Sequence, residues 1–131
     1  MNPRKKLTFW GAHEDDDSLV LSVIAGRKTV TADIVEDYYK GYGELGDGGY
    51  EAGDLIDVHD LRGLPRCTIR ATEVRVIRFG DIPEDVWRGE AFASADEFRE
   101  IHVRCLPHLD LHDDVKFVTL HFELVEVAPA S

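Results

Sequence analysis

The first strongly amphipathic stretch of the sequence covers residues 18–25. Its larger apolar side chains recur at the spacing of one helix face: Leu19, Val20, Val23 and Ile24. Apolar residues at this spacing are typical of a helix that buries one side. Gly26 follows at the place where helices commonly end in a residue of positive φ. We therefore predict a helix over residues 18–25 that ends at Gly26.

The five residues after this glycine combine cationic, hydroxyl and β-branched side chains in the order Arg27-Lys28-Thr29-Val30-Thr31. β-Branched residues favour an extended backbone. An extended segment would place Lys28 and Val30 on one side, and Thr29 and Thr31 on the other. Residue spacing alone favours a capped helix end followed by an edge strand. A phosphate-binding P-loop is excluded, because its upstream glycine is absent and a helix precedes the segment in place of a strand.

Two segments in the middle of the chain show the alternation of β-strands. Residues 55–59 and 66–79 are joined by turn-forming residues, which predicts a hairpin. Within the longer segment, the apolar residues stand at odd positions up to Ala71 and at even positions from Val74. This shift predicts a β-bulge near residues 72–73, a feature that bends a strand around a small barrel.

The C-terminal half contains two helix starts and one more strand. A proline at the first helical position predicts a short helical turn over residues 83–87. A serine and a glutamate three residues apart form a capping box, which predicts a helix over residues 95–105. We expect the stretch between these two helices to be irregular. Regular alternation over residues 115–127 predicts a closing strand.

The order of these elements predicts an α+β fold, a small mixed β-barrel flanked by two or three helices. An open α+β sheet is the alternative. With 131 residues, 44% of them hydrophobic, the chain fits a single domain over residues 1–131 with a real core. No apolar run has the length of a membrane span or the form of a secretory signal, so we expect a cytoplasmic protein with no membrane partner. Two cysteines do not make a disulfide framework.

The charge balance limits the possible partners. The formal net charge is −11 at pH 7, and so acidic a chain repels phosphate backbones unless its cations gather on one face. We therefore expect no binding of duplex DNA. A short RNA strand or a small nucleoside-like ligand remains a candidate partner.

Residues 38–50 combine four tyrosines with five glycines. Long glycine-rich loops are often lids over binding sites, and tyrosine rings can stack on the face of any base. We predict a mobile loop that borders a pocket, with Tyr38, Tyr42 and Tyr50 as ligand contacts. An ordinary surface loop is the alternative.

His108 and His112 are four residues apart, a spacing that can hold Zn²⁺ on a helix. Pro107 and the neighbouring aspartates disfavour a helix at this place. We expect a solvated loop here, and neither a metal ion nor another cofactor.

Taken in order, several motifs are similar to those of the ASCH family, whose fold is related to the PUA RNA-binding barrel. The most specific is the match of residues 21–31 to Leu-x-x-x-x-Gly-x-Lys-Thr-x-Thr. The other matching blocks, spread over nearly the whole chain, are Phe9-Trp10-Gly11, Gly53-Asp54, Phe79-Gly80-Asp81-Ile82, Gly89-Glu90, Phe98-Arg99 with His102, and residues 118–125. The chain departs from the family at Arg88, which replaces a glutamate, and at Phe98, which replaces a tryptophan.

The resemblance implies a role related to RNA or nucleosides. Some ASCH proteins resemble amidohydrolases that act on acylated cytidine, and others are described as ribonucleases. By match to the amidohydrolase members, the catalytic residues would be Lys28, Thr31 and Glu90. We also expect Arg27 and Thr29, in the same loop, to be ligand contacts. Amide hydrolysis needs a nucleophile, a base and a group that stabilises the oxyanion.

In these roles Thr31 would be the nucleophile, Lys28 the base or the oxyanion contact, and Glu90 an orienting acid or proton relay. An ion pair with Glu90 would keep the lysine charged, and a charged lysine is a poor base. A hydrolase predicts a pocket closed around Lys28 and Thr31. Two alternatives remain: an RNA- or nucleotide-binding module with an open groove, and a partner-binding regulator with no concave site.

Overall fold

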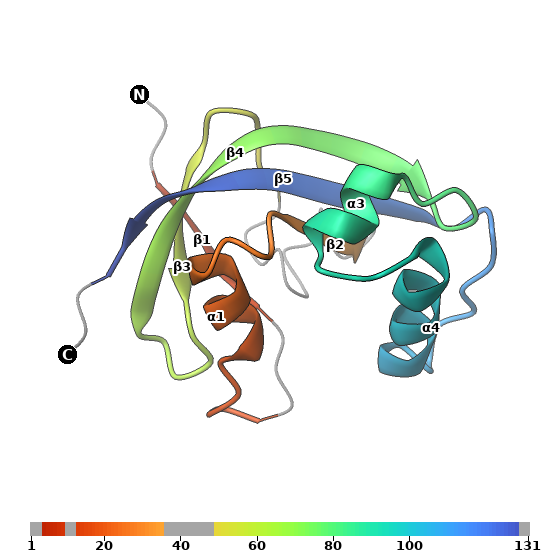
Figure 1. Ribbon diagram of the computed structural model, residues 1–131, viewed down its shortest axis with the longest axis horizontal. Helices are drawn as coiled ribbons and strands as arrows, with labels where there is room; N and C mark the ends of the chain where they lie inside the picture. Colours follow the sequence, from red (N-terminus) through yellow and green to blue (C-terminus); the bar gives the residue numbers. More distant parts are fainter. Residues whose placement is uncertain (1–3, 10–12, 36–48, 129–131) are drawn as a thin grey trace.

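The computed structural model describes residues 4–9, 13–35 and 49–128, which form five strands and three helices around a curled mixed sheet (Figure 1). The elements in chain order are β1 (Lys5–Thr8), α1 (Ser18–Ile24), β2 (Val30–Ile34), β3 (Leu55–His59), β4 (Pro65–Arg78), α3 (Glu84–Gly89), α4 (Ala95–Cys105) and β5 (Lys116–Val127). The strand order is β1-β3-β4-β5-β2, with β1 parallel to β3 and every other pair antiparallel. The predicted α+β fold, a small mixed barrel flanked by two or three helices, is confirmed, and the barrel is a half-barrel formed by the curled sheet.

The two long strands β4 and β5 span the whole sheet and bend together (Figure 1). Their register shifts between Ala71 and Glu73, which confirms the β-bulge predicted at this point. The bulge moves Val74 onto the face where it packs with the core residue Leu120, its register partner. Val76 lies on the same face, but it is 57% exposed, so the predicted apolar face ends before it.

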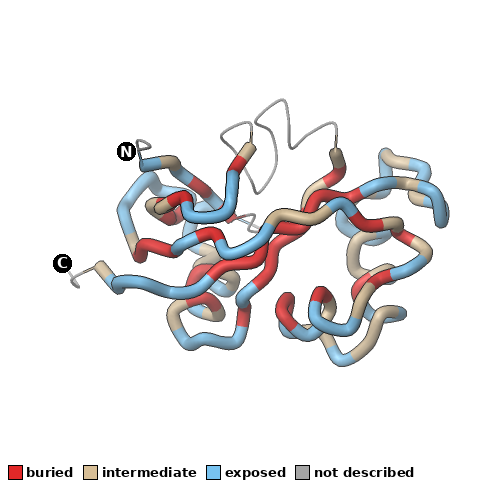
Figure 2. The backbone as a smooth tube through the Cα atoms, turned by 90° about the horizontal axis from the view of Figure 1, so that it is seen from above, coloured by how far each residue is buried: buried red, intermediate tan, exposed pale blue. Residues whose placement is uncertain are grey.

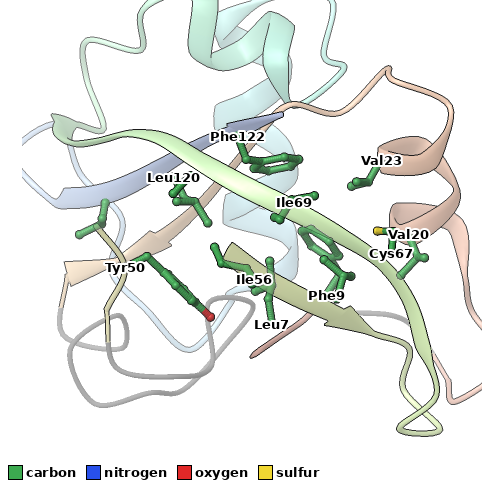
Figure 3. Packing of buried hydrophobic residues seen from close by; sticks show 13 residues of the cluster. Leu7, Phe9, Val20, Val23, Tyr50, Ile56, Cys67, Ile69, Leu120 and Phe122 are labelled. Atoms are coloured by element: carbon green, nitrogen blue, oxygen red, sulfur yellow. The ribbon is translucent and has the colours of Figure 1, made fainter. Parts of the chain in front are cut away.

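Alternate side chains of β5 enter two separate cores. The α1-side core, drawn as sticks in Figure 3 with most of its residues labelled, contains Leu7, Phe9, Val20, Val23, Tyr50, Ile56, Val58, Cys67, Ile69, Ala71, Val118, Leu120 and Phe122. The α4-side core contains Val30, Ala32, Ile34, Ile77, Phe79, Ile82, Val86, Phe98 and Phe117. Figure 2 shows the buried segments concentrated along the central strands that separate these two cores.

The predicted helices form where local signals are strong. Helix α1 ends one residue before its predicted end, and Gly26 has φ +79°. Helix α4 has its predicted bounds, because the Ser94 side chain accepts a hydrogen bond from the Glu97 N–H at 3.1 Å. Helix α3 is longer than predicted and reaches Gly89, so the prediction that this residue lies in an irregular stretch is wrong. Glu90 is consequently the C-cap residue of a helix.

Strand β1 was not predicted, because a four-residue strand that pairs in parallel with a distant segment has little local signal. Most of the predicted tyrosine-rich loop lies outside the described residues. Among the described residues, no helix is long and apolar enough to cross a membrane.

Candidate functional site

Lys28 and Glu90 meet although 62 positions separate them in the sequence. The Lys28 ammonium donates to Glu90 Oε1 at 3.3 Å, and the two side chains are only 3% and 5% exposed. A charge removed from water needs an opposite charge or several hydrogen bonds to be tolerated. The loop after α1 and the end of α3 therefore build one buried charged site.

The Lys28 loop is held by backbone hydrogen bonds on both sides. The N–H groups of Arg27 and Lys28 donate to the Ser22 carbonyl at 2.9 and 3.1 Å, which closes the end of α1. The Thr29 N–H then donates to the Gly89 carbonyl at 2.6 Å, and the Thr29 carbonyl accepts from the Phe122 N–H at 2.9 Å. Thr29 thus links the C-terminus of α3 to the sheet.

Gly89 makes this close approach possible. A Cβ at Gly89 would lie 2.3 Å from Val30 Cγ2 and 3.1 Å from Thr29 Oγ1. Real Cβ atoms do not come so close to another atom. The buried Val30 side chain has little room to move away, because protein cores are packed as densely as organic crystals. The missing side chain therefore lets α3 contact β2 and brings Glu90 within reach of Lys28.

Lys28 extends toward the α1-side core. Its Nζ lies 5.5 Å from the centre of the Phe9 ring, which is itself a member of that core. An aromatic face attracts a cation at this distance. The expectation that Lys28 and Val30 share one side is wrong: Val30 belongs to the α4-side core, because the extended backbone of β2 begins only at Val30.

Thr31 lies on the same sheet face as the α1-side core. It is fully buried and pairs in register with Leu120, a member of that core. Lys28 reaches the α1-side core through Phe9, so both residues are on one side of the sheet. The structure thus joins Lys28 directly to Glu90 and places the Thr31 hydroxyl on the sheet face toward which Lys28 extends.

The family model of the ASCH domain matches residues 6–126 of the sequence. The chain belongs to the ASCH domain family. Among curated proteins, none matches the chain. Similar solved structures include protein EF3133 from Enterococcus faecalis, with TM-score 0.73 and 24% identity over 95% of this chain and 77% of that one.

Two further structures carry ASCH in their descriptions. The ASCH domain from Lactobacillus crispatus has TM-score 0.68 and 20% identity, over 93% of this chain and 80% of that one. The S128A mutant of ZmASCH from Zymomonas mobilis has TM-score 0.53 and 12% identity, over 95% of this chain and 74% of that one. At these identities the likeness establishes the shared fold alone.

The residues of this ASCH domain that were predicted to contact a ligand differ in how far they are exposed. Arg27 and Thr29 are exposed beside Lys28. Tyr50 is buried in the α1-side core, where its hydroxyl donates to the Lys6 carbonyl and its ring lies 5.7 Å from Lys5 Nζ. Tyr38 and Tyr42 lie outside the described residues. Tyr50 therefore joins β1 to the chain before β3.

Most of the basic side chains around the sheet are in ion pairs. These pairs join Arg4 to Asp57, Lys5 to Asp54, Arg66 to Asp17 and Asp60, Arg70 to Glu123, Arg75 to Glu73 and Asp85, and Arg78 to Asp81 and Asp114. Each pairing lowers the positive charge available to a phosphate backbone. In the described part of the chain, neighbouring acids therefore offset the positive charge of these side chains.

His108 and His112 lie in the irregular segment between α4 and β5, as the sequence predicted. In the described part of the chain, no group of three or more His, Cys, Asp or Glu is arranged to hold a metal ion. A surface hollow over α4, lined by Arg99, Glu100, Val103 and Arg104, contains none of the predicted site residues.

The contributions of Phe9 and Gly89 to the site were not predicted from the sequence, because neither residue suggests catalysis or binding by itself. Both residues belong to blocks that resemble the ASCH family, and this was the signal that could have found them.

The turn that follows Glu90 is strained. Ala91 has φ +65°, the left-handed region that costs an L-residue about 1–2 kcal/mol. We expect Ala91→Gly to raise the free energy of unfolding by about 1 kcal/mol, because glycine adopts this φ without the clash.

Urea unfolding measures this change. Ala93→Gly is the matched control, because this nearby exposed alanine is not among the residues of positive φ, and its replacement is expected to be neutral or destabilising. Equal effects of the two substitutions would contradict strain at Ala91.

Proposed function

We propose that this ASCH domain hydrolyses the amide bond of an acylated pyrimidine nucleoside. The observation that supports this most is the buried Lys28–Glu90 ion pair on the side of the sheet where Thr31 is also buried. Ionisable side chains that are buried together away from the rest of the charged surface are characteristic of catalytic sites. The family is generally associated with RNA, which favours a ligand derived from a nucleoside.

In the proposed reaction the Thr31 hydroxyl attacks the amide carbonyl and forms an acyl ester. The Lys28 ammonium stabilises the oxyanion, and Glu90 holds that ammonium in place. Glu90 also takes the hydroxyl proton and passes it to the leaving amine. Water then attacks the ester, releases the acid and restores Thr31.

The alternative role of Lys28 as the base is less favoured. The Lys28 ammonium donates to Glu90 at 3.3 Å and lies over the Phe9 ring, and an ammonium has no lone pair with which to accept a proton. An oxyanion contact needs that charged form. We therefore assign Lys28 to the oxyanion and ligand contact.

A non-catalytic pocket for the same ligand is the second candidate, because a charged lysine would also hold a ligand without any chemistry. The low exposure of Lys28 and Thr31 argues against an open RNA groove. RNA cleavage by the same residues is a further outcome of the test below.

The test incubates the purified domain with a panel of acylated and unmodified nucleosides and a short RNA, with and without a divalent metal ion. Chromatography follows the products, and calorimetry follows binding. Release of free nucleoside from an acylated one supports the hydrolase. Binding without products would establish the non-catalytic pocket, and shortened RNA would establish a ribonuclease.

A further inference from the structure

A second cluster of polar residues lies beneath α3, on the sheet face of the α4-side core. We call it the α3 anchor cluster; it contains Glu73, Arg75, Asp85, Thr119 and His121. In the sheet register His121 pairs with Glu73, and Thr119 pairs with Arg75. Thr119 is fully buried and His121 is 9% exposed. No step of the proposed hydrolysis uses these residues.

The contacts within the cluster attach α3 to β4. Arg75 Nη1 donates to Asp85 Oδ1 at 3.3 Å, and its Nη2 also donates to Asp85 Oδ2. Arg75 Nε lies 2.7 Å from Glu73 Oε1. On β5, the Thr119 hydroxyl and His121 Nε2 are 3.1 Å apart. Arg75 is therefore a second link between α3 and the sheet, besides the Thr29–Gly89 hydrogen bond.

Helix α3 has only six residues, too few to be stable without tertiary contacts. Its start is attached through Asp85 to Arg75, and its end through the Gly89 carbonyl to Thr29. Glu90 follows directly after this end. A displacement at Asp85 must therefore move Glu90 or strain the bond at Thr29.

The sheet provides a second connection between the two ends. His121 is the register partner of Val30, and the Val30 side chain lies against Gly89, the residue directly before Glu90.

We propose that the α3 anchor cluster positions Glu90 against Lys28, and that proton uptake by His121 loosens this arrangement. The imidazolium attracts Asp85 and Glu73 and repels Arg75, so it competes with Arg75 for the carboxylate that holds α3. Arg75, Asp85 and His121 are positioning residues, since none of them touches the Lys28–Glu90 pair. Only the effect on turnover rests on the proposed function.

The direction of the pKa shift of His121 agrees with this proposal. Burial lowers the pKa of His121 below its usual value of 6.5; Arg75 acts in the same direction, whereas Asp85 and Glu73 oppose it. The hydrogen bond from Arg75 holds the pKa of Asp85 below its usual range. Because the unfolded chain takes up the histidine proton first, the stability due to neutral His121 is complete above pH 6.5. It falls as the pH decreases from 6.5 through the pKa of folded His121.

The test uses NMR on the intact domain, without any ligand. The Thr29 amide reports the bond to Gly89, and the His121 ring signals report its protonation. We expect the Thr29 amide shift to titrate with the midpoint of the His121 ring. In His121→Gln, which cannot take up a proton, this step in the Thr29 titration is expected to disappear.

The second arm replaces Asp85 by Asn. We expect hydrogen exchange at the Thr29 amide to accelerate by up to about fivefold, because the Asp85 side chain is 57% exposed and a pair so exposed contributes at most about 1 kcal/mol. Arg70→Gln is the matched control: Arg70 is also on β4 and pairs with an acid, Glu123, but not with α3. It should leave Thr29 exchange unchanged.

A Thr29 shift that does not follow His121, or an Asp85→Asn exchange rate equal to that of the wild type, would overturn the proposal. If the domain hydrolyses acylated nucleosides, kcat is also expected to fall with the His121 midpoint in the wild type, and not in His121→Gln. A normal NMR response in a domain without hydrolytic activity would refute the hydrolase alone and leave this coupling standing.

Discussion

Lys28→Met is expected to lower the free energy of unfolding by about 3–5 kcal/mol, the cost of removing one partner from a buried ion pair. Methionine fills a similar volume, so the main change is a Glu90 carboxylate left in the interior without the ammonium at 3.3 Å. Glu90→Gln is expected to cost less, because its amide still accepts a hydrogen bond from Lys28. Urea unfolding at pH 7 measures both losses.

The double variant Lys28→Met/Glu90→Gln separates the ion pair from ordinary packing. With both charges removed, its loss of stability should be clearly smaller than the sum of the two single losses. The surface pair of Arg70 and Glu123, whose side chains are 48% and 54% exposed, is the control and should contribute at most about 1 kcal/mol. Additive losses at Lys28 and Glu90 would contradict a coupled buried pair.

Gly89→Ala is expected to destabilise the domain by about 1–3 kcal/mol, the usual cost of an extra carbon in a packed core. The added Cβ would lie 2.3 Å from Val30 Cγ2, so α3 and β2 must separate. That separation stretches the Thr29–Gly89 hydrogen bond and withdraws Glu90 from Lys28. We therefore expect a loss of hydrolysis together with the loss of stability.

Shortening the opposing side chain tests this explanation. Val30→Ala removes Cγ2, which the new Cβ would meet at 2.3 Å, and keeps only the Val30 Cβ at 2.9 Å. Gly89→Ala/Val30→Ala should therefore be more stable than the sum of the single losses predicts. Thermal unfolding of the four proteins gives the coupling directly. Strictly additive losses would contradict the contact with Val30 Cγ2 as the reason for a glycine at position 89.

The elements predicted correctly are those whose signals are local. Helix α4 is defined by a capping box within four residues, and the bulge in β4 by a shift of the apolar positions within that strand. Strand β1 pairs in parallel with β3, far away in sequence, and its four residues, Lys-Lys-Leu-Thr, do not specify that partner. Pairing between distant segments depends on the whole sheet, which no local pattern encodes.

In the candidate site, too, local features could be predicted from the sequence and features that depend on tertiary contacts could not. The helix end at Gly26 and the extended β2 follow from residue types, but the side of the sheet that Lys28 occupies depends on where β2 begins. The meeting of Lys28 and Glu90 requires α3 to pack on β2, and this depends on the small size of Gly89. Tyr50, predicted as a ligand contact, is held in the α1-side core by a backbone carbonyl of β1. Tertiary contacts decide each of these points.

The reaction of Thr31→Ala with an acylated pyrimidine nucleoside tests the central proposal most directly. The wild type should release the free nucleoside, and Thr31→Ala should turn over at least about a thousandfold more slowly, because a nucleophile acts in the chemical step. Its binding of the same nucleoside, measured by calorimetry, should remain close to that of the wild type. Thr31→Ser is the matched control and should retain turnover, since serine keeps a hydroxyl at the same position. Full turnover by Thr31→Ala would contradict the assignment of Thr31 as the nucleophile.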